Sequence, residues 1–155
     1  MTDSDRSDEP ASMPEWYAPG LAFECTQCGN CCTGPTGFVW VSDEELRAIA
    51  AALGRPESEI ERHFTRLLHG RRSLTEVPTQ HGYDCVFLDR ESQPGKALCR
   101  IYEARPMQCR TWPFWPENLR QGRDWQRAAQ TCPGINQGPL IPIESIRIQR
   151  DATPR

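Results

Sequence analysis

The clearest pattern of apolar and polar positions lies between residues 42 and 54. Apolar residues recur there three and four positions apart, as on one face of a helix: Leu46, Ile49, Ala50 and Leu53. Before them, Ser42-Asp43-Glu44-Glu45 matches a capping box, in which the Ser42 and Glu45 side chains bind each other's backbone amides. Gly54 follows the last apolar position and suits the left-handed residue that ends a helix. The pattern therefore predicts a helix that Ser42 caps and Gly54 ends.

Two further stretches have helical spacing. We predict a second helix that begins near Pro56 and ends at Gly70, with these residues on its inner face: Ile60, Phe64, Leu67 and Leu68. A third helix is predicted over residues 118–130, because Leu119, Trp125 and Ala128 can share one face. Residues 101–104 are expected to form a short helical turn. These helices are all short.

Other stretches indicate strands. Residues 37–42 are predicted as a short strand. Two apolar runs flank Ser92-Gln93-Pro94-Gly95, which predicts a β-hairpin with Cys85 on one arm and Cys99 on the other. Residues 140–148 alternate between apolar and polar positions and are expected to add an edge strand. The elements together predict an α+β fold: a small, loop-rich single domain, with a few short helices and a β-hairpin, that bound metal holds together.

Composition and charge narrow the class of protein. The chain has 155 residues, 37% of them hydrophobic, with 14 Pro, 11 Gly and a mean hydropathy of -0.66, so the apolar core is expected to be modest. We expect residues 1–14 to form a disordered acidic tail and residues 15–150 to form the cysteine-rich domain. The net charge of -3 gives no sign of nucleic-acid binding. We expect a cytoplasmic protein without a membrane partner, because no apolar run approaches the ~20 residues of a membrane span and the start lacks the apolar region of a secretory signal.

Candidate chemistry is concentrated in the cysteines. There are eight of them, and four stand within the stretch C-T-Q-C-G-N-C-C: Cys25, Cys28, Cys31, Cys32, Cys85, Cys99, Cys109 and Cys132. Three uses are open, namely disulfides, dithiol redox chemistry and metal binding. Structural disulfides suit exported proteins, and a dithiol oxidoreductase uses one C-x-x-C pair, usually in a βαβ context. Metal binding is therefore favoured.

The identity of the metal stays open at this point. The run C-x2-C-x2-C is similar to the ferredoxin run that holds an iron–sulfur cluster, while eight thiols would also fill two four-ligand zinc sites. Side chains of adjacent residues diverge, so Cys31 and Cys32 are expected to face different sites or different irons. We favour Cys25, Cys28, Cys31 and one later cysteine around one centre, and Cys32 with the remaining later cysteines around a second.

The motifs resemble a known family. The pattern F-x-C-x-x-C-x-x-C-C, then C-x-F-L, then C-x-I-Y-x-x-R-P-x-x-C-R-x-x-P-F and a last Cys runs from Phe23 to Cys132. It is similar to the YkgJ-type cysteine-cluster proteins, also written CxxCxxCC, which are regarded as zinc- or iron-chelating domains. The resemblance implies that all eight cysteines bind metal. It also raises the expectation that Arg105 and Arg110 support the metal-bound sulfurs or bind an anionic substrate, and it places Tyr102 beside them.

Three functions remain open from the sequence. The first is a structural or carrier module for zinc or iron; the second is a redox or catalytic iron–sulfur protein that works with a partner enzyme. The third is an adaptor whose T-W-P-F-W-P segment contacts a protein partner. No acid–base dyad, Ser–His arrangement or phosphate-binding loop is visible, so the sequence makes no case for an enzyme of those classes. His63, His69 and His81 are expected to be exposed to solvent rather than to bind metal.

Overall fold

The computed structural model describes residues 14–155 and has a mixed α+β architecture, as predicted. The helices are α1 (Asp43–Leu53), α2 (Glu57–Phe64), α3 (Met107–Arg110), α4 (Pro116–Leu119), α5 (Gly122–Ala129) and α6 (Ile143–Ala152), with 3-10 turns η1 (Asn30–Cys32) and η2 (Tyr102–Ala104). The strands are β1 (Leu21–Phe23), β2 (Thr65–Leu68), β3 (Arg71–Leu74), β4 (Glu76–Thr79), β5 (Gly82–Cys85), β6 (Leu88–Asp89), β7 (Leu98–Cys99) and β8 (Ile135–Ile141). The predicted acidic tail falls, apart from Pro14, outside the described residues.

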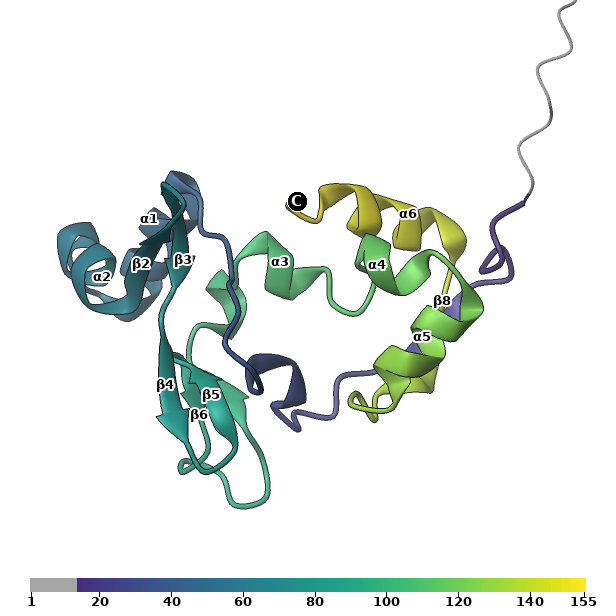
Figure 1. Ribbon diagram of the computed structural model, residues 1–155, viewed down its shortest axis with the longest axis horizontal. Coiled ribbons are helices and arrows are strands. Elements are labelled where there is room, and N and C mark those ends of the chain that lie inside the picture. Colours follow the sequence, from purple (N-terminus) through teal and green to yellow (C-terminus); the bar gives the residue numbers. More distant parts are fainter. Residues whose placement is uncertain (1–13) are drawn as a thin grey trace, which may run out of the picture.

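The described strands form four separate antiparallel pairs, β1–β8, β2–β3, β4–β5 and β6–β7. Three of these pairs join neighbours in the chain, whereas β1–β8 brings the two ends of the domain together. Figure 1 shows α1, α2 and the β2–β3 hairpin at one end of the molecule and α4, α5 and α6 at the other, with α3 between them. Within residues 14–155, no helix is long and apolar enough to cross a membrane.

The buried apolar side chains gather in two clusters. The Trp125 cluster consists of Tyr17, Leu21, Phe114, Leu119, Trp125, Ala128, Cys132, Ile135 and Ile146. The Ile49 cluster consists of Val41, Leu46, Ile49, Ala50, Ile60, Leu74, Phe87, Ile101 and Ala104. A chain with so few hydrophobic residues thus divides its apolar burial between two small cores, and Cys85 and Cys99 pack against the second.

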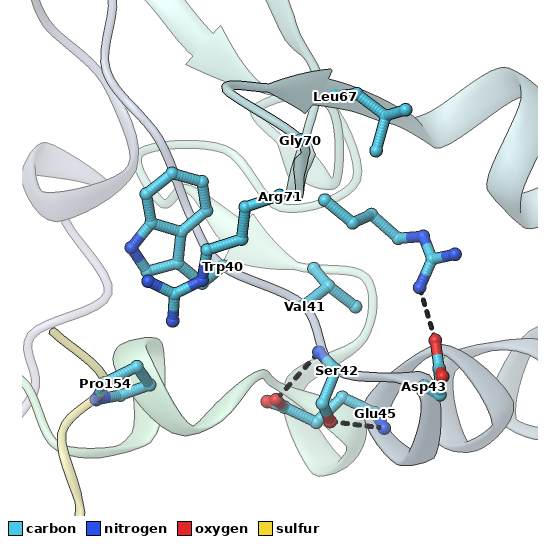
Figure 2. Close-up of a pocket in the computed structure, with 10 residues that line it drawn as sticks. Trp40, Val41, Ser42, Asp43, Glu45, Leu67, Gly70, Arg71 and Pro154 are labelled. Carbon is cyan, nitrogen blue, oxygen red and sulfur yellow. Dashed lines mark hydrogen bonds and ion pairs between the residues drawn. The ribbon is translucent and has the colours of Figure 1, made fainter.

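The structure confirms the predicted helix between Ser42 and Gly54, which is α1. The Ser42 hydroxyl accepts from the Glu45 amide at 3.1 Å, and Glu45 Oε1 accepts from the Ser42 amide at 3.1 Å, as Figure 2 shows. Leu46, Ile49 and Ala50 are buried in the Ile49 cluster, so the predicted apolar face is the one that packs. Gly54 ends the helix in the left-handed conformation, with φ of 62°.

The second helix ends six residues earlier than predicted. Helix α2 ends at Phe64, and the next residues form strand β2, which turns at His69-Gly70 and pairs with β3. Both turn residues have positive φ, 51° and 78°, as a tight hairpin turn with right-handed strand twist requires. Leu67, predicted on the inner face, is 71% exposed. The tertiary pairing of β2 with β3 overrides the helical spacing here.

The chain end also departs from its prediction. Strand β8 ends at Ile141, and residues 143–152 form helix α6 instead of continuing an edge strand. Pro142 stands at the N-cap and has no amide to donate to a ladder, and Ile146 on the helix is fully buried. The alternation of apolar residues was misleading because Ile143 and Ile146 also have helical spacing, while Ile148 is 70% exposed.

The remaining elements are partly as predicted. Cys99 lies on β7 of the short β6–β7 hairpin, whereas Cys85 ends β5, which pairs with β4 instead. The predicted helix over residues 118–130 is divided into α4 and α5, and the predicted turn at residues 101–104 is η2. Within the predicted strand over residues 37–42, Trp40 forms an isolated bridge to Ser73.

An ion-pair group fastens the start of the described chain to α6, and it gives a pH-dependent prediction. Arg147 and Arg150 donate to the Glu15 carboxylate at 2.6 to 2.9 Å, and the hydrogen bond from Arg147 lowers the pKa of Glu15 from 4.5 to about 2. A carboxyl with a lowered pKa stabilises the fold above its unfolded pKa and loses that contribution as pH falls. Urea unfolding should therefore show Glu15→Gln about 0.5–1 kcal/mol less stable than wild type at pH 7. The difference should shrink as pH falls from 4.5 toward 2; a difference that does not change with pH would contradict it.

Candidate metal centre

The loop with four cysteines is clamped against the β6–β7 hairpin. The Gln27 carbonyl accepts from the Ala97 amide at 2.9 Å, and the Gln27 side chain accepts from Lys96 at 2.8 Å. Gly29 has φ of 75°, and a Cβ at this position would stand 2.5 Å from the Ala97 Cβ. Glycine is therefore needed at position 29 both for its backbone conformation and for the close approach of the hairpin.

The other side of the loop is fastened to β5. The Thr33 hydroxyl donates to Asp84 Oδ1 at 2.5 Å, and the Gly34 carbonyl accepts from the Tyr83 amide at 2.8 Å. Arg90 donates to both oxygens of the buried Asp84 carboxylate at 2.7 and 3.1 Å, and this pairing lowers the pKa of Asp84 to about 2. An ionised Asp84 thus holds the end of the cysteine loop at the strand that carries Cys85.

Six of the eight predicted ligands line one cavity of about 320 Å³. They are Cys25, Cys31, Cys32, Cys85, Cys99 and Cys109. They come from the loop and η1, from the ends of β5 and β7, and from α3. The apolar wall of the cavity includes three members of the Ile49 cluster, Leu74, Phe87 and Ile101. A water-excluding wall with thiols around it is the environment in which metal–thiolate bonds are favoured.

The structure does not bring the other two cysteines to this cavity. Cys28 is half-buried, and its sulfur accepts from the Asn30 amide at 3.4 Å. Cys132 is buried in the Trp125 cluster. The assignment of all eight cysteines to metal, and their division between two centres, therefore stay predictions.

The thiols surround the cavity without meeting at one point. Within residues 14–155, no three Cys, His, Asp or Glu side chains are grouped so that they could hold one metal ion. All eight cysteines are free, and the Cys31 and Cys32 sulfurs are 3.7 Å apart. Their hydrogen bond lowers the pKa of Cys31 to about 7 and raises the pKa of Cys32. Burial raises the pKa of Cys85 to about 11 and also raises the pKa of Cys109.

The raised pKa values of Cys32, Cys85 and Cys109 describe thiols that need a cation nearby before they can ionise. The thiolate is the form that binds metal, and a bound metal supplies the positive charge that burial otherwise denies it. Among the described residues that line the cavity, Arg105 is the one with a basic side chain. Its positive charge contributes to the lowered pKa of Cys31.

Arg105, Tyr102 and Arg110 take different positions. The Arg105 guanidinium lies over the Tyr102 ring, 3.9 Å from its centroid, and both residues line the cavity. Arg110 is not among the lining residues; it donates to the backbone carbonyls of Arg105 and Glu103 at 2.8 and 2.9 Å. Arg110 thus supports the backbone that carries Arg105, and Arg100, beside Cys99, is exposed. The predicted roles of Arg105, Arg110 and Tyr102 toward metal-bound sulfur remain predictions.

Gln108, which sequence reasoning did not single out, completes the wall together with two tryptophans of the T-W-P-F-W-P segment, which the sequence indicates as a hydrophobic lid over the metal region. Gln108 is buried, and its side-chain amide binds the Trp40 amide and the Phe38 carbonyl, both at 3.0 Å, which holds that segment against α3. Trp112 and Trp115 also line the cavity. Trp115 donates its indole N–H to the Gln108 carbonyl at 2.8 Å, whereas the buried Trp112 indole N–H has no partner among the described residues. Phe114, from the same T-W-P-F-W-P segment, is buried in the Trp125 cluster.

A second hollow contains none of these cysteines. It has a volume of about 580 Å³ and lies between the N-terminus of α1, the β2–β3 hairpin and Pro154 (Figure 2). Its charged groups are already used: the Arg71 guanidinium stacks 4.3 Å from the Trp40 ring centroid, and Arg72 pairs with Asp43 at 2.7 Å. His63, His69 and His81 are exposed, as predicted. The cysteine cavity is therefore the candidate site.

Gly29 allows a matched test of the clamp on the cysteine loop. Gly29→Ala should destabilise the metal-loaded protein by about 1–3 kcal/mol more than Gly95→Ala, because the new methyl group collides with the β6–β7 hairpin. Gly95 is the control because its φ of 76° is almost the same, yet no atom lies within 4 Å of a Cβ at this position. Urea unfolding measures both, and equal losses would show that only the backbone conformation matters.

The part of the chain that carries the cysteines is similar to known proteins. The sequence model of the CxxCxxCC family, described as a "putative zinc- or iron-chelating domain", matches residues 24–133. An uncharacterized protein of Methanocaldococcus jannaschii, MJ0661, is 35% identical over 99 residues, which cover 63% of this chain and 48% of that protein. The chain thus spans about half the length of this relative. No solved structure matches. The match covers the cysteine loop and every segment that lines the cavity, so the chain belongs to the CxxCxxCC family of zinc- or iron-chelating domains.

Proposed function

We propose that the six-cysteine cavity holds an iron–sulfur cluster and that the protein exchanges electrons with a partner enzyme. The observation that carries the proposal is the placement of six thiols around one cavity of about 320 Å³. A single metal ion needs its ligands grouped at one point, and no such group occurs within residues 14–155. A water takes up about 30 Å³, so this cavity has room for a group of many atoms.

The chemistry of the wall supports the same group. Thiolates are the usual ligands of iron–sulfur clusters, and such a group would supply one-electron oxidation and reduction. Arg105 would offset part of its negative charge. The buried Trp112 indole N–H has no acceptor among the described residues, and a cluster sulfur in the cavity it lines would provide one.

The surroundings of the cavity suit contact with another molecule. Phe38 and Tyr102 line the cavity and are nevertheless 52% and 48% exposed. They therefore form an accessible aromatic rim where a partner can approach the bound group. All eight cysteines are free. A reducing compartment keeps cysteines as free thiols, and we therefore propose a cytoplasmic location.

The test is iron and acid-labile sulfide analysis of protein purified without oxygen, together with its visible spectrum. The proposal expects iron and sulfide in similar amounts and a broad absorption near ~400 nm that dithionite bleaches. Colourless protein with stoichiometric zinc would replace it with a structural zinc module. Protein that contains no metal and whose thiols are oxidised to disulfides would overturn the proposal.

A further inference from the structure

Glu76 stands beside one of the cavity cysteines because of the β4–β5 register. The two residues directly opposite each other in this antiparallel pair are Glu76 and Cys85. Directly opposed residues project their side chains from the same face, with Cβ atoms about 4.5–5.5 Å apart. The pairing therefore brings a carboxylate next to a thiol of the candidate centre.

The two oxygens of Glu76 have different surroundings. Oε1 accepts from the Gly37 amide at 2.7 Å and lies 3.8 Å from the Arg66 guanidinium, so the side chain is held in place. Oε2 is buried and has no hydrogen-bond partner among the described residues. A buried, unpaired oxygen of a carboxylate is more costly than a buried, unpaired neutral group, so a further partner is expected.

The space beside Glu76 is a small hollow of about 120 Å³. Its lining includes Cys31, Cys32 and Cys85 together with Glu76. The same three cysteines line the larger cavity, so they stand between the two hollows. Three thiols and the Glu76 carboxylate are thus the acidic donors on this side of the centre, beside the hydroxyl groups of Thr33, Thr75 and Tyr83.

We propose that Glu76 supplies an oxygen ligand to the metal group that the cysteine cavity holds, on the side of Cys31, Cys32 and Cys85. The inference rests on the proposed function and adds a non-cysteine ligand to it. Carboxylate oxygens bind both zinc and iron alongside thiolates. The Nε of Arg66 is likewise buried without a hydrogen-bond partner among the described residues, so the alternative to metal ligation is a pairing of Arg66 with Oε2, which the Arg66→Met variant tests. An oxygen ligand makes one metal atom different from those held only by sulfur.

The test is X-ray absorption at the metal edge, with metal affinity measured by chelator competition, on wild type, Glu76→Gln and Arg66→Met. Wild type should show an oxygen shell beside the sulfur shell. Glu76→Gln keeps an oxygen that can accept from Gly37 but removes the charge, and it should lose the oxygen shell and bind metal roughly 10- to 100-fold more weakly. Arg66→Met removes the neighbouring cation and should keep the oxygen shell and most of the affinity.

The outcomes separate this inference from the proposed function. Metal bound by sulfur alone in wild type, or an oxygen shell that Glu76→Gln leaves unchanged, overturns the ligand role of Glu76 while the metal centre stands. Equal losses of affinity in Glu76→Gln and Arg66→Met, with the oxygen shell unchanged, mean that Glu76 acts only through the fold. Wild-type protein that binds no metal overturns the proposed function itself.

Discussion

Removal of the bound metal is expected to unfold the part of the protein around the cysteine cavity and to leave the Trp125 cluster largely folded. Ligation can contribute on the order of 10 kcal/mol to folding in a small metal-binding domain. Native domains are stable by only about 5–15 kcal/mol, so such a loss is enough to unfold the segments that depend on the ligands. Three members of the Ile49 cluster wall the cavity, whereas none of the buried members of the Trp125 cluster does so.

Hydrogen exchange measures this prediction segment by segment. After treatment with a chelator under reducing conditions, amides of β5, β7 and α3 should lose protection, while those of α5 should keep it. The control is the addition of metal back to the same sample, which should restore protection. Uniform loss across both clusters would mean that the protein unfolds as one unit. Unchanged protection would mean that metal contributes little to the fold.

The parts of the fold that the sequence predicts well are those set by neighbours in the chain. The capping box at Ser42 and the end of α1 at Gly54 depend on residues within one helical turn, and both are confirmed. Strand β2 is different, because Leu67 and Leu68 suit a helix by spacing alone. Only the His69-Gly70 dipeptide indicates a turn there, and His at a positive φ is not a strong signal.

The residues of the candidate site also divide into those placed by neighbours in the chain and those placed by tertiary contacts. The C-x2-C-x2-C run places its thiols in one loop by covalent connection, so sequence alone identifies them as a cluster. Cys85, Cys99 and Cys109 join that loop through contacts between distant segments, such as the hydrogen bond from the Ala97 amide to the Gln27 carbonyl. Glu76 gives no signal in the sequence, since its meaning depends on the register that sets it opposite Cys85.

The division into two clusters also predicts a large effect on stability without an effect on the metal. Trp125 is fully buried, stacks on Phe114 with ring centroids 5.7 Å apart, and donates its indole N–H to Asn136 Oδ1 at 2.9 Å. Trp125→Ala should destabilise the protein by about 3–5 kcal/mol, because it removes a large side chain from a packed core and leaves the Asn136 oxygen without its donor. Urea unfolding of the metal-loaded protein measures this loss.

Two variants show which part of the effect comes from packing. Trp125→Phe keeps an aromatic ring and should lose less than Trp125→Ala, since only part of the volume and the N–H are removed. Trp16→Ala removes the same side chain from a position that is 38% exposed and should cost less than Trp125→Ala. Metal content should stay at the wild-type level in all three variants, because neither tryptophan lines the cysteine cavity. Loss of metal from Trp125→Ala protein that is still folded would show that the Trp125 cluster and the cysteine cavity are coupled.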